Sequence, residues 1–491
     1  MKFFSDLWQG CKNVFKGPAS KDNLFSLDNR VPFKSAIPFG LQHFLAMFAS
    51  SITPILIVFS RIGLTGDFAV YSMLSALFMA GFATMIQLFF GARLPVVMGT
   101  SFTFLPIFIT IGISAGGGEA AYYTILGSTV VGGLIATVLS LTHKWWGRII
   151  KPIVPPVVVL GVGLSLLANA ANGFFGGNSV LMNMIENGNT GTGVPYFCYI
   201  IVALATLITA LLWSLFVKGV WKNINIVVGI AVGYIISCCI PGMIDFSKLA
   251  VTEVVGSNGV IDYPHLINIG KLRIELVPCI LVTICFLVTI VEEIGGATAV
   301  AETGLQRKPT VRELGGTLVV GNVTSSIGAL FGAFPLTTYA QNVGVVAQNK
   351  VVNRFTIFIG AIFLFIASFF PPVANFIYTI PDAVIGGTMV ILFGSITVIG
   401  MKSISELGWN DKNIMITAIS VCLGFGITVA TVTTGSGLFM STSVFNKLGL
   451  EWLGDLLSNC VLNMFVISFI LSWLLPDSMH ISLFHKKENK Q

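Results

Sequence analysis

Charged residues are scarce in this chain, since only 10% of its 491 residues are Asp, Glu, Lys or Arg. A soluble domain typically carries about 25% charged residues, so the composition excludes an ordinary soluble protein. Hydrophobic residues make up 55% of the chain. We therefore expect an integral membrane protein, for which domain number cannot be estimated from length.

Motifs typical of enzymes and ATP-driven pumps are also missing. The sequence has no GxxxxGK[ST] phosphate-binding loop, no HExxH motif, no CxxC pair and no repeated channel-filter motif. Its eight cysteines are scattered and its five histidines are too sparse for a zinc site, so we interpret the cysteines as small buried hydrophobic residues. These absences argue against an enzyme, a channel or an ATPase and predict no cofactor.

Long apolar runs fit spanning helices, which need about 20 mostly apolar residues. Fourteen runs are predicted in two groups of seven. The first group is 36–59, 69–91, 95–113, 121–143, 151–170, 195–217 and 223–241. The second group is 276–300, 314–333, 337–352, 354–371, 380–401, 412–429 and 454–475. Two runs, 95–113 and 337–352, are short or interrupted.

The distribution of positive charge orients these spans. With residues 1–35 in the cytoplasm, 22 of the 27 Lys and Arg residues lie in inside segments and 5 lie outside. This bias follows the positive-inside rule. We expect a multi-pass protein of the plasma membrane, the bacterial inner membrane, with both 1–35 and the tail 476–491 cytoplasmic. The net charge of +6 then needs no nucleic-acid partner.

A short motif recurs in the two groups, as GARLP at 91–95 and GAFP at 332–335. Each copy precedes an interrupted span and a patch of polar and aromatic residues. Because seven spans are an odd number, the two groups cross the bilayer in opposite directions and form an inverted repeat, the usual plan of secondary transporters. Broken helices of both halves then line a cavity near the midplane. The alternative is two coincidental Pro-Gly kinks.

Ionisable residues inside predicted spans usually mark function, because burying them is costly. Glu292 shares a helical face with Gly295, Gly296 and Ala299, and this nearly bare face leaves room for a flat ligand. We predict that Glu292 binds the ligand, the alternative being an ion-paired Glu in a helix-packing seam. Glu293 points elsewhere and is either a helper or a structural residue.

Other polar residues complete the predicted site. His43 is expected at or just behind it, or else as a hydrogen-bonded structural residue. Asp382 fits a favourable charge at a helix N-terminus better than a ligand. Gln341 offers a donor and an acceptor in one plane for a heterocycle, and Tyr339 and Phe102 supply apolar or stacking surface.

These residues resemble the nucleobase–ascorbate transporter family, also called nucleobase:cation symporter-2, across roughly 36–475. The family's first-span Gln-His is matched by Gln42-His43 and its eighth-span Glu motif by 292–295. Its tenth-span signature is matched at 341–344, with Asn349, Asn353 and Arg354 following. We predict these substrate-binding residues: Glu292, Gln341, Phe102, Asn342, Ala340 and Tyr339. We predict these coupling or supporting residues: His43, Glu293, Gly296, Ser101 and Gly344.

The resemblance implies an all-α polytopic fold of fourteen transmembrane segments in a 7+7 inverted repeat, with short antiparallel strands in segments 3 and 10 where the base binds. It also implies a core domain of 36–143 and 276–371 and a gate domain of 151–241 and 380–475. Family members are commonly homodimers that move substrate by an elevator-like shift of the core against the gate.

The substrate implied is a purine nucleobase such as xanthine or urate, because family purine carriers generally have Gln where Gln341 stands and uracil carriers have Glu. The coupling ion is H⁺ or Na⁺. A uracil permease of the same fold is the alternative, and a sulfate-like anion carrier fits less well because Glu292 repels anions. The chain departs from the family at Asn349, Lys350 and Asn353. It has Gly321 and Gly296 where many purine carriers have Asp, so Glu293 is a candidate replacement for a missing acid.

Overall fold

The computed structural model describes residues 13–64, 66–142, 145, 149–217, 225–246, 264–267, 269–339, 342, 345–346, 350–434 and 460–476. The chain divides into two compact units. The first comprises Met1–Trp145 and Leu166–Phe393, and the second Trp146–Ser165 and Gly394–Gln491. Each unit is described separately below.

The described part is mainly helical. In chain order the elements are η1 (Asp22–Phe25), α2 (Phe33–Ile62), α3 (Asp67–Phe89), β1 (Met98–Thr100), α4 (Leu105–Ser114), α5 (Gly118–Leu141), α7 (Val154–Phe174), α8 (Asn178–Asn187), α9 (Tyr196–Phe216) and α10 (Asn225–Cys238). Then follow η4 (Ile269–Lys271), α11 (Leu276–Leu305), α12 (Val311–Leu330), β2 (Leu336–Thr338), α14 (Arg354–Ala367), α15 (Pro371–Tyr378), α16 (Asp382–Glu406), α17 (Asp411–Thr434) and α20 (Cys460–Leu474).

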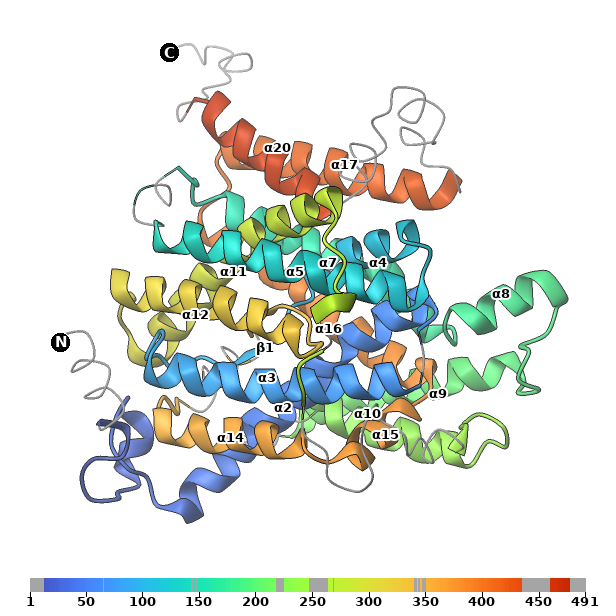
Figure 1. Cartoon of the computed structure of the whole chain (residues 1–491), viewed down its shortest axis with the longest axis horizontal. Coiled ribbons are helices and arrows are strands. Elements are labelled where there is room, and N and C mark those ends of the chain that lie inside the picture. The colour runs from blue at the N-terminus through green and yellow to red at the C-terminus, as the bar shows by residue number, and fades with distance from the viewer. Residues whose placement is uncertain are drawn as a thin grey trace, which may run out of the picture. The chain divides into compact units, whose positions relative to one another are not determined.

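Helices from the first and second halves of the sequence interleave in the first unit. Helix α5 packs against both α11 and α12, and α14 packs against both α2 and α3. The order α11, α12, α3, α14 can be followed in Figure 1. Small residues allow these helices to approach closely, as where Gly40 of α2 meets Gly360 of α14.

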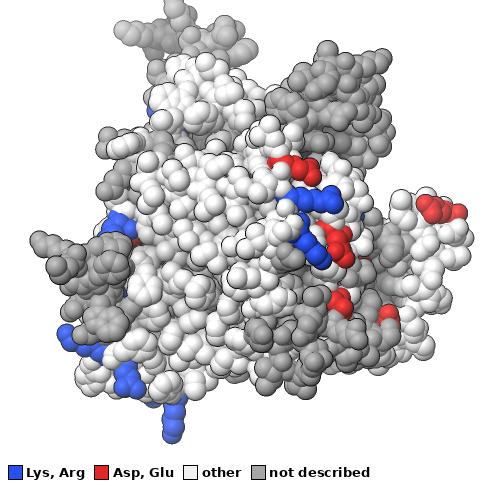
Figure 2. Space-filling model, in the orientation of Figure 1, with Lys and Arg blue, Asp and Glu red and all other residues white. Residues whose placement is uncertain are grey.

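Many helices expose apolar side chains, which a protein surrounded by water rarely does over large areas. On α9 an apolar stripe at helical spacing includes Phe197, Ile201, Ile208 and Leu215, of which Leu215 is 72% exposed. The face drawn in Figure 2 carries few charged side chains over its described surface. Six described helices are long and apolar enough to cross a membrane, or seven if α14 and α15, bent by 81°, form one span.

Two short strands join segments that are far apart in the sequence. Strand β1 pairs antiparallel with β2, with Met98 opposite Thr338 and Thr100 opposite Leu336. The first residue of each strand is hydrogen-bonded to a side-chain hydroxyl of a neighbouring helix. Met98 N–H donates to Thr84 Oγ1 of α3, and Leu336 N–H donates to Ser325 Oγ of α12, both at 2.9 Å.

The turns that lead into the strands are also anchored. Before β1, Ala92 N–H donates to Gln87 Oε1, and Gln87 Nε2 donates to the Thr317 carbonyl of α12 at 2.8 Å. Before β2, the carbonyl of Gly332 accepts from Ser72 of α3 and Tyr122 of α5. The strands therefore sit on a rigid helical frame.

The second unit contains the first part of α7, the last part of α16, and helices α17 and α20. Helices of this unit approach each other closely at glycines. A Cβ on Gly400 of α16 would lie 2.5 Å from the backbone nitrogen of Leu160 of α7. Helices α17 and α20 pack together, and Gly424 faces Met464.

Between the predicted spans 151–170 and 195–217, where no helix was predicted, the structure has helix α8. Its sequence NSVLMNMIEN is amphipathic, and glycines at 177 and 188 bound it. The helix is ten residues long, too short to stand out as an apolar run.

Candidate functional site

The best-defined polar contact of the predicted site joins α11 to the segment after β1. Thr103 Oγ1 donates to Glu292 Oε2 at 2.8 Å. Glu292 is only partly buried, and a Cβ added to Gly295 would meet none of the described residues within 4 Å. A carboxylate therefore borders open space on this face of α11, with one of its oxygens fixed by a hydroxyl.

The predicted residue Gly296 lies where α11 meets β2. A side chain at this position would place its Cβ 2.5 Å from Thr338 Oγ1, so the absence of a side chain permits the contact. Among the described residues, the buried hydroxyls of Thr337 and Thr338 have no hydrogen-bond partner. The strand pair thus presents polar groups close to α11.

Tyr339, which follows β2, packs back onto β1. Its ring covers Gly99, where any Cβ would overlap it, and its hydroxyl donates to the Thr100 carbonyl at 3.1 Å. Only 4% of Tyr339 is exposed. The structure therefore gives Tyr339 a role in holding the strands together.

His43 and Asn342 form a second contact between distant segments. His43 of α2 is buried and its side chain interacts with that of Asn342. Asn342 Nδ2 also donates to the Pro95 carbonyl at 2.8 Å. Through Asn342, His43 is therefore linked to the turn that leads into β1.

Ser101 and Phe102 come directly after β1. The Ser101 N–H donates to the Pro335 carbonyl at 2.8 Å, and Ser101 Oγ accepts from Thr103 N–H. The ring of Phe102 packs edge-on against Phe393, with ring centres 5.5 Å apart. The other predicted residues, Ala340, Gln341 and Gly344, lie outside the described residues.

Glu293 faces a different environment from Glu292. It is 1% exposed, and its carboxylate fills the space that a side chain at Gly321 of α12 would occupy. Glu293 Oε2 has no hydrogen-bond partner in the described part of the chain. Gly321 and Gly296 are the two positions where many purine carriers have Asp. The Glu293 carboxylate occupies the side-chain space of position 321 and not that of position 296.

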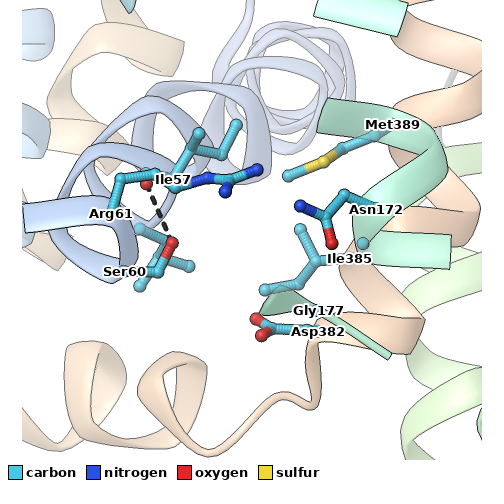
Figure 3. Close-up of a pocket in the computed structure, with 10 residues that line it drawn as sticks. Ile57, Ser60, Arg61, Asn172, Gly177, Asp382, Ile385 and Met389 are labelled. Atoms are coloured by element: carbon cyan, nitrogen blue, oxygen red, sulfur yellow. Dashed lines mark hydrogen bonds between the residues drawn. The ribbon is translucent and has the colours of Figure 1, made fainter. Parts of the chain in front are cut away.

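A pocket in the first unit lies at the end of α2. Arg61 of α2 and Asp382, the first residue of α16, line it together with Asn172, Ser60, Ile385 and Met389 (Figure 3). Arg61 and Asp382 attract each other electrostatically. The pocket holds none of the residues predicted for the substrate site.

Sequence reasoning missed two features. Thr103 lies in the polar patch after β1, but nothing in the pattern distinguished it from Ser101. Arg61 and Asp382 are more than 300 residues apart in the sequence, so their proximity left no local signal. Within the described ranges, no group of three His, Cys, Asp or Glu side chains could hold a metal ion.

The family model and the similar sequences of known function point to one family of permeases. A family model described as "Permease family" (Xan_ur_permease) matches residues 34–435. Xanthine permease XanQ of Escherichia coli K12 is 29% identical over 422 residues, which cover 83% of this chain and 87% of that protein. Uric acid permease PucK of Bacillus subtilis 168 is 32% identical over 423 residues, covering 82% and 92%.

Solved structures share the fold. The transmembrane domain of the cyanobacterial bicarbonate transporter BicA aligns with a TM-score of 0.56 at 14% identity, covering 90% of this chain and 97% of that one. Murine Slc26a9, an anion transporter, aligns with the same TM-score and identity, covering 91% and 75%. At this identity the likeness shows the fold alone. Together with the family match, these observations establish that the chain is a multi-pass membrane transporter, not an enzyme, and belongs to the nucleobase–ascorbate transporter family.

Proposed function

We propose that this protein imports a purine nucleobase such as xanthine or urate. The observation that carries the proposal is the Glu292 carboxylate beside the open face at Gly295, with Thr103 bonded to one carboxylate oxygen. Oxygens of an ionised carboxylate accept hydrogen bonds from the ring N–H groups of such bases. The names of the relatives XanQ and PucK, a xanthine and a uric acid permease, point to the same class.

Uptake of labelled xanthine tests this proposal in cells that lack their own base permeases. Urate and other purines should compete, and uracil should not. Competition by uracil instead would favour a pyrimidine permease of the same fold. Absence of xanthine uptake and of competition by any purine would overturn the purine proposal.

Replacing the carboxylate tests the site itself. Glu292→Gln should lower uptake about 10- to 100-fold, because a hydrogen bond to a charged group contributes roughly 1.5–3 kcal/mol. Glu302→Gln is the matched control, since Glu302 lies exposed on the same helix. Near-normal uptake by Glu292→Gln at equal membrane expression would exclude Glu292 from binding.

The coupling ion is proposed to be H⁺, with Na⁺ as the alternative. The membrane potential adds about 2.3 kcal/mol per charge per 100 mV to such uptake. A protonophore should abolish accumulation, whereas removal of external Na⁺ should not. The reverse result would assign Na⁺.

The proposed transport cycle moves 36–143 and 276–371 as a core domain against a gate of 151–241 and 380–475, within a 7+7 inverted repeat of fourteen spans. Packing of α5 against α11 and α12, and of α14 against α2 and α3, supports a single core. Cross-links between core helices should leave transport intact, and cross-links from core to gate should stop it.

We further propose a homodimer in the plasma membrane with both termini cytoplasmic. The bias of 22 Lys and Arg residues inside against 5 outside supports this orientation. Reporter fusions at each terminus test the topology, and the mass of the purified protein in detergent tests the dimer.

A further inference from the structure

Glu293 is the most deeply buried acid of the described part of the chain, and its burial is built into the fold. Its carboxylate lies over Gly321, the one residue type without a side chain, and Oε2 has no hydrogen-bond partner among the residues described. Ionised carboxylates buried without a partner cost several kcal/mol. The position therefore favours a neutral, protonated acid.

Among the described residues, no cation is found to act on Glu293. The elements packed against α11 include α5, α12, α4 and β2, and the segment 92–96, which carries Arg93, packs against its later turns. The charged residues of these helices and strands are Glu119 in the first turn of α5 and Arg312 and Glu313 in the first turn of α12. Their remaining stretches, 120–141, 314–330, 105–114 and 336–338, contain no Asp, Glu, Lys, Arg or His. In the described part of the chain, the charged group that acts on Glu293 electrostatically is Glu292, the preceding residue.

From this geometry we infer that Glu293 carries the coupling proton, while Glu292 binds the substrate. The inference rests on the proposed function and deepens it. A proton from the outer side binds the Glu293 carboxylate and leaves as the same proton on the inner side, so no other reactant is needed.

The adjacency of the two acids supplies the coupling. Glu292 must be ionised to accept two N–H groups from a base, and two negative charges on neighbouring residues repel each other. A proton on Glu293 removes that repulsion and favours substrate binding at Glu292. By reciprocity, bound substrate favours the proton on Glu293, which is the linkage that a symporter requires.

Glu293→Gln tests the division of roles, because the amide is a permanently neutral copy of the protonated acid. In proteoliposomes this variant should still exchange internal for external xanthine at near the wild-type rate. It should lose accumulation driven by a pH gradient and should move no protons with xanthine. Unchanged gradient-driven accumulation would overturn the inference, and so would loss of exchange in correctly inserted protein.

Moving the carboxylate across the helix interface gives an independent test. A side chain at 321 enters the space of the Glu293 carboxylate, so Glu293→Ala combined with Gly321→Asp should restore proton-driven accumulation that Glu293→Ala alone lacks. Failure of this pair to restore coupling, while exchange persists in both variants, would count against a carboxylate site at this position.

Gly321→Ala should displace the Glu293 carboxylate and weaken accumulation more than exchange. Gly328→Ala on the same helix is the matched control, because its Cβ would meet its nearest neighbour, Met79 Cγ, at an ordinary 3.4 Å. Equal accumulation by these two variants would contradict the inference.

These outcomes separate the inference from the proposed function. Absence of xanthine exchange in the wild-type protein would overturn the proposed substrate. Wild-type exchange without any response to a pH gradient would leave the substrate in place and overturn the role of Glu293.

Discussion

The guanidinium of Arg354 is paired with the carboxylate of Asp28, although the two residues are 326 positions apart. Arg354 Nε donates to Asp28 Oδ1 at 2.7 Å, a second nitrogen bonds the same oxygen, and Nη1 donates to the Leu88 carbonyl. The side-chain amide of the neighbouring Asn353 lies within hydrogen-bond distance of the carbonyls of Asn23, Ser26, Asp28 and Asn29, that of Asn23 at 2.9 Å. The end of the family signature therefore holds the N-terminal segment against α3 and α14.

Asp28→Asn should destabilise the protein by about 1–3 kcal/mol, because it leaves a buried guanidinium without its charged partner. Thermal unfolding in detergent measures the loss. Asp22→Asn, an exposed acid in the same segment, should change little. Equal melting temperatures for the two variants would show that the pair does not anchor the segment.

Filling the open face beside Glu292 should block the substrate and spare the fold. A Cβ at Gly295 meets no atom of the described residues within 4 Å, so Gly295→Val should insert normally and raise the apparent KM for xanthine by about tenfold or more, equivalent to about 1.4 kcal/mol. Unchanged KM would indicate that substrate does not use this face.

The crossing of α2 and α14 should tolerate no added methyl group. A Cβ at Gly360 would lie 2.7 Å from the Gly40 carbonyl and 3.3 Å from His43 Cβ. We expect Gly360→Ala to lower stability by about 1–3 kcal/mol, as overpacking does. Gly394→Ala is the control, because no atom of the described residues lies within 4 Å of a Cβ at that position. A similar melting temperature for both variants would refute the tight crossing.

The interactions of Glu313 at the start of α12 should make part of the free energy of unfolding depend on pH. Burial acts to raise the pKa of Glu313, but hydrogen bonds from Arg307 and Thr310 outweigh it and lower the pKa. This contribution is therefore fully present above the unfolded-state pKa and is lost as pH falls through the folded-state pKa.

Glu313→Gln should flatten the fall in melting temperature between about pH 6 and about pH 3, around the ordinary Glu value of about 4.3. Thr310→Ala removes the reciprocal cap and should cost about 1 kcal/mol at neutral pH. An unaltered pH profile for Glu313→Gln would contradict the assignment.

The sequence predicted the class of protein and its family because those properties depend on composition and local pattern. Apolar runs predicted the positions of most described helices within a few residues, since a spanning helix must be apolar along its length. The family resemblance is confirmed by the match over 34–435. Helix α8 was missed because a short amphipathic helix leaves no such run.

The details of the site depend on contacts between residues far apart in the sequence, which local sequence patterns do not reveal. Glu292 was chosen for its bare helical face, but its bond to Thr103 joins residues 189 positions apart. The contact of Glu293 with Gly321 is between two helices, and spacing along either helix could not reveal it. Tyr339 was predicted as stacking surface from residue type alone, whereas its hydroxyl binds the backbone of Thr100.

The pairing of β1 with β2 has a consequence for biogenesis. Its two strands come from segments far apart in the sequence, and the Tyr339–Thr100 bond spans 239 positions. Until Leu336 has been synthesised, the backbone groups of β1 lack their strand partner, and unpaired backbone is costly within a bilayer. The candidate site thus cannot be completed before β2 has been made, and a chain that stops earlier has no closed strand pair and no complete binding site.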